Sequence, residues 1–253
     1  MNLIMENFCM SKYQTILIDE VPSTNSYAMS QIQQLRDKTV LYTHNQTSGR
    51  GRYNRKWIAD GTDNLYVTFV FKPDDIEHYP LANLTQYLSL MLCEYLEKEF
   101  KIKPNIKWPN DILVDGCKIS GILAESYMEN NKIKGLVLGL GLNVNLKAET
   151  IENIDQKATS LSVLTDRNYE IELILNGLCD RFFEDYDLFV QQGFSFIKER
   201  YEQRCNFLGK NIRIREINGT KEYFAKAITD DGLLLVEDEF GKEGKIITGD
   251  LLC

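Results

Sequence analysis

Positive charge is concentrated in one short segment, QTSGRGRYNRKW at residues 46–57, which contains no acidic residue. Its cations are Arg50, Arg52, Arg55 and Lys56. Arginine forks bind phosphate or carboxylate oxygens through paired, charge-assisted hydrogen bonds, and Gly49 and Gly51 would let the backbone approach such a ligand closely. We therefore predict an anion-binding loop that orders over its ligand as a lid. A solvated surface loop is the alternative, because basic clusters are common on protein surfaces.

The segment KWPND, residues 107–111, is a second candidate. Pro109 biases Trp108 toward an extended backbone, which disfavours a helix at this point. Asn110 and Asp111 are therefore expected at the entrance of a strand, where an amide and a carboxylate would be presented to a ligand.

A lysine follows in the next apolar run. Asp115-Gly116 is typical of a two-residue hairpin turn. Such a turn sets Leu113 opposite Lys118, so that Asp111 and Lys118 become diagonal neighbours on one sheet face. Lys118 stands in the otherwise apolar run KISGIL, with Gly121 where tight packing is needed, and we expect an anionic partner for it beyond Asp111. A structural salt bridge is the alternative.

A third group of polar residues precedes an expected helix. Ser23, Thr24 and Asn25 follow Pro22 and suit a helix N-cap, which is the default role for each of them. Together the three side chains would also recognise a small polar head group.

Common nucleotide-binding loops are absent from the sequence. No segment matches G-x-x-x-x-G-K-[ST]. The run GLGLNVN at 139–145 begins like a dinucleotide fingerprint, but it lacks the third glycine and its β-rich sequence does not open a helix. We interpret it as a close-packed strand with a polar end.

Composition excludes several classes of protein. Hydrophobic residues make up 43% and charged residues 26%, a balance that fills a core and argues against disorder. The net charge of −8 disfavours a general nucleic-acid binder. Six cysteines without a C-x-x-C pair, and only His44 and His78, make a zinc cluster improbable. Without a signal peptide or an apolar span in the sequence, we expect a cytoplasmic protein with reduced thiols.

The elements that would position these residues form an α+β fold. Apolar periodicity predicts a buried helix over 81–100 and a long or broken helix over 170–204, with a mixed central sheet that has its helices on one side. Short strands and turns at the C-terminus predict a small β barrel. The expected domains are 1–204 and 205–253. Strands of the central sheet are expected at 16–19, 39–43, 65–71 and 135–145 and on either side of Asp115-Gly116.

Five motifs in chain order resemble the motif set of the biotin protein ligases. They are STN (23–25), QTSGRGRYNRKW (46–57), KWPND (107–111), KISGIL (118–123) and GLGLNVN (139–145). The resemblance covers Ile16 to Leu161 closely and the middle helical stretch weakly. It implies the class II synthetase-like fold of the biotin and lipoate ligases, closed by a small SH3-like C-terminal domain.

The resemblance also implies a reaction. Such an enzyme joins biotin to ATP as biotinyl-5′-AMP and then transfers the biotinyl group to one lysine of a biotin carboxyl carrier domain of a carboxylase. ATP would be accompanied by Mg²⁺, bound mainly through phosphate oxygens and water rather than by a protein metal site. Because one anion must attack another, cations that screen their repulsion should dominate catalysis.

By the family pattern, each candidate residue receives a role. Lys118, Arg50 and Asp111 would be catalytic. Biotin would be bound by Ser23, Thr24, Asn25, Gln46, Gly49, Arg50, Gly51, Arg52, Lys118 and Gly121. ATP and the adenylate would be bound by Arg50, Arg52, Arg55, Trp57, Asn110, Lys118 and Asn143.

This chain departs from the larger family members. The first expected strand begins near Ile16, which leaves no space for an N-terminal winged helix-turn-helix, so we expect ligase activity without operator binding. Tyr53 stands where some members have a third arginine, which bears on how strongly the adenylate is retained. Lipoate protein ligase and a non-catalytic nucleic-acid binder are the alternatives. A homodimer is left open, because exposed strand edges would permit sheet-to-sheet pairing.

Overall fold

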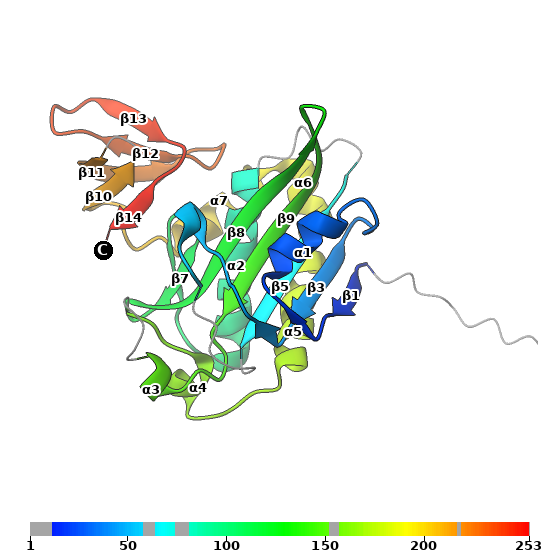
Figure 1. The fold of residues 1–253 in the computed structure, drawn as a ribbon. Helices are drawn as coiled ribbons and strands as arrows, with labels where there is room; N and C mark the ends of the chain where they lie inside the picture. The colour runs from blue at the N-terminus through cyan, green and yellow to red at the C-terminus, as the bar shows by residue number, and fades with distance from the viewer. Residues whose placement is uncertain (1–11, 58–63, 74–80, 152–156, 217–218, 253) are drawn as a thin grey trace, which may run out of the picture.

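A seven-stranded mixed sheet forms the centre of the molecule, with a second, five-stranded sheet at the C-terminus (Figure 1). This computed structural model describes residues 12–57, 64–73, 81–151, 157–216 and 219–252. The predicted α+β class with a mixed central sheet is confirmed.

The central sheet combines one parallel pair with antiparallel neighbours. The two strands at one edge of the sheet, β1 and β3, run parallel to each other. Every other pair of neighbouring strands is antiparallel. In spatial order the strands are β1 (Gln14–Leu17), β3 (Thr39–Thr43), β5 (Leu65–Phe71), β9 (Lys132–Leu142), β8 (Cys117–Glu129), β7 (Asp111–Val114) and β6 (Asn105–Lys107). A separate parallel pair joins β2 (Glu20–Val21) to β4 (Asn45–Gln46).

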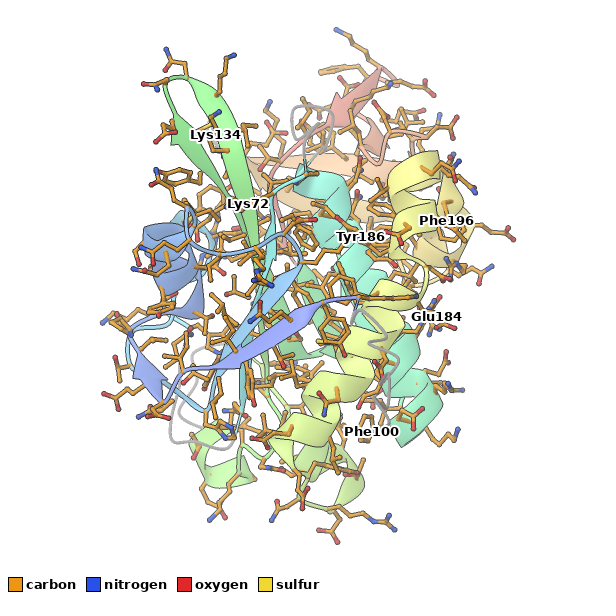
Figure 2. The ribbon with its side chains drawn as sticks, turned by 90° about the vertical axis from the view of Figure 1, so that its right-hand side faces the viewer. Lys72, Phe100, Lys134, Glu184, Tyr186 and Phe196 are labelled. Carbon is orange, nitrogen blue, oxygen red and sulfur yellow. The ribbon has the colours of Figure 1, made fainter. Side chains whose placement is uncertain are left out.

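Two tight turns set the register of this sheet. Asp115 and Gly116 both have positive φ, at 49° and 78°, as a type I′ hairpin turn requires. Leu113 therefore pairs with Lys118, as predicted. A similar turn at Asn130 and Asn131 joins β8 to β9, whose hairpin extends beyond its neighbours with Lys134 near the tip (Figure 2).

The long helices cover one face of the sheet. They are α2 (Leu81–Phe100) and α5 (Ile171–Glu184), followed by α6 (Tyr186–Gln192) and α7 (Lys198–Glu202). Aromatic rings are prominent in the contact, as in the stacked pair of Phe71 and Tyr186 at 5.3 Å between centroids. Tyr186 is labelled in Figure 2. The region 170–204, predicted as one long helix or two, is interrupted at Asp185 as well as near Gly193. Within the described residues, no helix is both long and apolar enough to cross a membrane.

The opposite face carries the short helix α1 (Thr24–Gln31) (Figure 1). Ala28 and Ile32 of this helix region pack against Leu41, Val70 and Val137 of the sheet. The helices are therefore not all on one side, although the long ones are. Two further helices, α3 (Ala148–Ile151) and α4 (Leu161–Thr165), lie in the connection between β9 and α5.

Strand β9 divides its side chains between these two faces. Leu136, Leu138, Leu140 and Leu142 belong to the core beneath the long helices. The alternate positions on the α1 face include glycines, and a Cβ on Gly139 would lie 2.2 Å from Asn25 Oδ1. The glycines thus leave room on the face that the long helices do not cover.

The C-terminal sheet is antiparallel and ordered β13-β12-β11-β10-β14. Its strands are β10 (Asn211–Glu216), β11 (Gly219–Ile228), β12 (Leu234–Glu237), β13 (Glu243–Ile246) and β14 (Asp250–Leu252). Ile214 and Leu234 of this sheet belong to the same buried cluster as Leu88 of α2. The division into domains 1–204 and 205–253 stays a prediction.

A turn of the C-terminal sheet is anchored on α2. Gln86 Nε2 donates to Gly232 O at 2.8 Å, and Asn83 Nδ2 donates to Asp231 O at 3.1 Å. Gly232 has a φ of +83°, and a Cβ there would lie 2.3 Å from Asn83 Nδ2. Both the backbone conformation and the contact therefore require glycine.

We expect Gly232→Ala to lower the free energy of unfolding by roughly 2 kcal/mol, because strain and overpacking act together. Urea denaturation measures the loss. Gly241→Ala is the matched control, since Gly241 has a similar φ of +77° and no atom within 4 Å of a Cβ. It should show the strain alone, roughly 1 kcal/mol. Equal losses in the two variants would contradict the anchoring role.

The described cysteines are free thiols, and three of the four are buried. Cys93, Cys179 and Cys205 are buried, and burial raises the pKa of the Cys93 thiol to about 12. A thiol so far from its thiolate form is a poor nucleophile. Cys9 and Cys253 lie outside the described residues.

Candidate active site

A cavity of about 520 Å³ opens on the α1 face of the central sheet. All the residues proposed from the sequence line it, except Gly49: Ser23, Thr24, Asn25, Gln46, Arg50, Gly51, Arg52, Arg55, Trp57, Asn110, Asp111, Lys118, Gly121 and Asn143. The structure thus brings together motifs that are spread over residues 23–143 of the chain. The individual roles stay predictions.

One end of the cavity is the start of α1. Ser23 is the N-cap, with its Oγ accepting a hydrogen bond from Ser26 N at 3.4 Å. Gln46 Oε1 accepts from Thr24 N at 3.0 Å and lies 3.4 Å from Thr24 Oγ1. Because these side chains are buried and partly hydrogen-bonded to one another, they form a fixed polar end to the cavity.

Asn25 makes its amide contacts with the protein. Its Nδ2 donates to Leu123 O at 3.0 Å and to Glu125 Oε2 at 2.9 Å, while its Oδ1 accepts from Thr68 Oγ1 at 2.7 Å. The side chain therefore ties α1 to strands β5 and β8. These contacts position the polar end of the cavity, and a direct contact of Asn25 with biotin stays a prediction.

The basic loop is folded back on itself at the cavity mouth. Gly51 N donates to Arg55 O at 2.7 Å, Trp57 N donates to Gly49 O at 3.0 Å, and a short 3₁₀ helix, η1 (Arg52–Asn54), forms its apex. Gly49 packs inside the loop, where a Cβ would lie 2.7 Å from Gln46 Nε2. Gly49 therefore shapes the loop and does not line the cavity.

Two carboxylates from other parts of the chain, those of Glu125 and Asp250, pair with the three arginines of this loop. Arg50 donates to both oxygens of Glu125, at 3.1 and 3.0 Å. Arg52 Nη1 contacts Asp250 Oδ1 at 3.1 Å, and Arg55 pairs with the other oxygen of Asp250. Figure 1 shows this part of the chain, in blue above β7, beside β14. The basic loop therefore joins the central sheet to the C-terminal sheet.

Sequence reasoning missed both of these carboxylates. Glu125 is 75 residues from Arg50, and Asp250 is 198 residues from Arg52, so no local pattern connects them. Arg52 Nη1 also donates to Asn110 Oδ1 and Gly249 O, at 3.1 and 3.0 Å. Lys56 lines the cavity too, and it has no anionic partner among the described residues.

Lys118 and Asp111 form the predicted pair. Lys118 Nζ lies 2.8 Å from Asp111 Oδ1, and both side chains are mostly buried. Among the described residues, Asp111 Oδ1 has no polar partner besides this ammonium. The expected second anion beside Lys118 is not supplied by these residues either. An ammonium and a carboxylate are thus held in the cavity wall with capacity for further contacts.

A neighbouring segment holds the backbone of Lys118. Lys118 N donates to Lys157 O and Thr159 N donates to Lys118 O, each at 2.9 Å. Asn143 Nδ2 donates to Thr159 O at 2.9 Å, which attaches the end of β9 to the same segment. Ala158 lines the cavity between these contacts, and no motif of the sequence pointed to it.

The floor of the cavity is made of glycines beneath an indole ring. A Cβ on Gly121 would lie 2.8 Å from Trp57 Cζ3, and a Cβ on Gly141 would lie 2.6 Å from Trp57 Cε2. Lys118 Nζ lies 5.3 Å from the centre of the Trp57 ring, a cation–π contact. The glycines of GLGLNVN are thus closely packed, as predicted, and the side chains that pack on them are those of Trp57 and Asn25.

His44 does not line this cavity. His44 Nε2 lies 2.8 Å from Glu172 Oε1. His78 lies outside the described residues.

Comparison with known proteins supports a common origin for this arrangement. Residues 17–143 match the Biotin/lipoate A/B protein ligase family. The bifunctional ligase/repressor BirA of Bacillus subtilis is 31% identical over 214 residues, covering 84% of this chain and 65% of that protein. The biotin--[acetyl-CoA-carboxylase] ligase of Mycobacterium tuberculosis is 29% identical, covering 85% of this chain and 79% of that protein.

A solved structure agrees over nearly the whole chain. The biotin protein ligase of Aquifex aeolicus, in complex with biotin and ATP, superposes with a TM-score of 0.82 at 28% identity, covering 94% of this chain and 97% of that one. The chain spans 65% of the length of the Bacillus relatives. The matched family and this shared architecture together show that the chain belongs to the biotin/lipoate A/B protein ligase family.

Proposed function

We propose that the protein activates biotin as biotinyl-5′-AMP, with release of pyrophosphate, and then transfers the biotinyl group to a lysine of a biotin carboxyl carrier domain. The observation that carries the proposal is the cavity itself, which joins a polar end, the Lys118–Asp111 pair and a basic loop. The names of the similar proteins support biotin as the acid.

In the first step an oxygen of the biotin carboxylate attacks the α-phosphorus of ATP. A new O–P bond forms while the bond to the pyrophosphate oxygen breaks, so the leaving group carries away the electron pair. The ammonium of Lys118 would contact both anions in this step, and Lys118, Arg50, Arg52 and Arg55 all line the same cavity. Fixed cations of this kind stabilise the charge that develops in the transition state.

In the second step the amine of the carrier lysine attacks the acyl carbon of the adenylate. An amide bond forms, AMP leaves, and the amine loses a proton. Asp111 lines the same cavity beside Lys118, which supports a role in orienting the amine or accepting that proton.

Magnesium would reach the site with ATP. The described residues contain no group of three or more His, Cys, Asp or Glu side chains placed to hold a metal ion. Phosphate oxygens and water would supply most of its ligands, and Asp111 and Asp250 are carboxylates of the cavity that would be close by. We place the reaction in the cytoplasm, where ATP is available and free thiols stay reduced.

Biotin is favoured over lipoate by the polar end of the cavity. The buried hydroxyl of Thr24 and the amide of Gln46 would meet the ureido head of biotin, whereas the dithiolane of lipoate offers no hydrogen-bond partner. A pyrophosphate-release assay with Mg-ATP and either acid tests the proposal. Biotin-dependent release supports it, and release with lipoate alone would reassign the substrate.

We expect Arg50→Ala to release biotinyl-5′-AMP about tenfold faster, because the variant loses the two hydrogen bonds that hold the loop on Glu125. Chasing labelled adenylate from the protein with unlabelled biotin and ATP measures the rate. Lys132→Ala, at the exposed start of β9, serves as the control and should behave as wild type. Unchanged release from Arg50→Ala would mean that the loop does not act as a lid.

A further inference from the structure

One residue of the basic loop has an unusual backbone conformation. Tyr53 has a φ of 54° and a ψ of 39°, in the left-handed region that glycine and asparagine adopt most readily. Among the described residues it is the one aromatic with positive φ, and the others apart from glycine are Lys, Asp or Asn. Its side chain is 58% exposed, so burial does not account for the tyrosine either.

The ring of Tyr53 contacts two arginines of the loop. The guanidinium carbon of Arg52 lies 5.0 Å from the ring centre, and that of Arg55 lies 5.8 Å from it. Arg52 Nη2 also donates a hydrogen bond to the Tyr53 hydroxyl at 3.2 Å. Arg52 and Arg55 line the cavity, whereas Tyr53 does not. The Tyr53 ring thus contacts two arginines that line the cavity, although the ring itself does not line it.

These contacts matter most for Arg55. Arg52 is also held by Asn110 and by Gly249 O. The Arg55 side chain is 54% exposed, and among the described residues its guanidinium contacts only Asp250 and the Tyr53 ring. An exposed ion pair holds a long side chain weakly, and an aromatic face adds to it. The tyrosine therefore fixes a cation that would otherwise be loosely held.

From this geometry we infer that Tyr53 is a positioning residue, whose ring holds Arg52 and Arg55 against Asp250 and thereby sets how long the adenylate is retained. The part of this inference that concerns the adenylate rests on the proposed function. The part that concerns the loop does not, because it rests on contacts between residues of the chain itself.

Trypsin tests the loop without any ligand, since Arg50, Arg52, Arg55 and Lys56 are all cleavage sites. Tyr53→Ala should be cleaved in this loop about tenfold faster, as expected from losing two cation–π contacts and a hydrogen bond. Tyr53→Asn should match it, although asparagine adopts the left-handed backbone readily. Tyr53→Phe keeps the ring and should stay within about threefold of wild type. Phe240→Ala, which removes an 87% exposed aromatic elsewhere, is the control and should change nothing.

The adenylate provides the second measurement. Tyr53→Ala and Tyr53→Asn should release biotinyl-5′-AMP about tenfold faster, with an unchanged melting temperature and Tyr53→Phe close to wild type. Wild-type cleavage and release in Tyr53→Asn would overturn the inference, because the backbone conformation would then be what matters. If the wild-type protein formed no adenylate, the proposed function would fail, while the trypsin result would still decide whether Tyr53 orders the loop.

Discussion

Lys118→Ala is expected to slow the formation of biotinyl-5′-AMP by about 100- to 1000-fold, the loss typical of removing a group that stabilises transition-state charge. Lys118 Nζ lies 2.8 Å from Asp111 and 5.3 Å from the centre of the Trp57 ring, in the wall of the cavity. Removing it leaves two substrate anions and the Asp111 carboxylate without this cation. The barrier to their approach should therefore rise more than substrate affinity falls.

A single-turnover measurement separates these effects. Wild-type and Lys118→Ala proteins are mixed with saturating biotin and Mg-ATP, and adenylate is followed in the absence of carrier. Lys157→Ala is the matched control, because the exposed Lys157 contacts Lys118 through its backbone oxygen, which alanine retains. A normal rate in folded Lys118→Ala protein would remove the residue from the mechanism.

Asp250→Ala is expected to lower kcat/KM for ATP by about 100-fold. The Asp250 side chain is 13% exposed and pairs with both Arg52 and Arg55. Removing one partner of a largely buried ion pair costs about 3 kcal/mol. The exposure of Arg55 lowers this cost, whereas the loss of the carboxylate by two cations at once raises it, so about 3 kcal/mol remains the expected value. A free-energy cost of that size shifts the equilibrium between the loop paired with Asp250 and the released loop by about 100-fold.

Steady-state kinetics at varied ATP test this expectation. Asp230→Ala is the control, since Asp230 also pairs with a cation, Lys198, but is fully on the surface of the C-terminal sheet region. It should leave kcat/KM unchanged. If Asp250→Ala also retained wild-type kinetics, the contact between the basic loop and β14 would have no part in the reaction.

Local chemistry explains which parts of the site could be predicted from the sequence. The Asp115-Gly116 turn sets the register of its own hairpin, so the approach of Asp111 to Lys118 followed from neighbouring residues. Likewise, Ser23 caps the helix that begins immediately after it. These features need no knowledge of the rest of the chain.

Long-range partners could not be predicted in the same way. The carboxylates on Arg50 and Arg52 come from strands far away in the sequence, and acidic residues are too common for charge alone to identify them. Strand β6 (Asn105–Lys107) is too short to show a period of two. The break at Asp185 lies within a continuous amphipathic pattern, so only packing reveals it.

The alternation of leucine and glycine along β9 makes the register of this strand as important as its composition. Leu138 and Leu140 face the helices, while Gly139 and Gly141 face Asn25 and Trp57. Deleting one residue near Gly135 would shift the register of the rest of the strand by one residue, so that its leucines would point into the cavity and its glycines into the core. Natural variation in length should therefore be confined to the Asn130–Asn131 turn, where the hairpin extends beyond its neighbours.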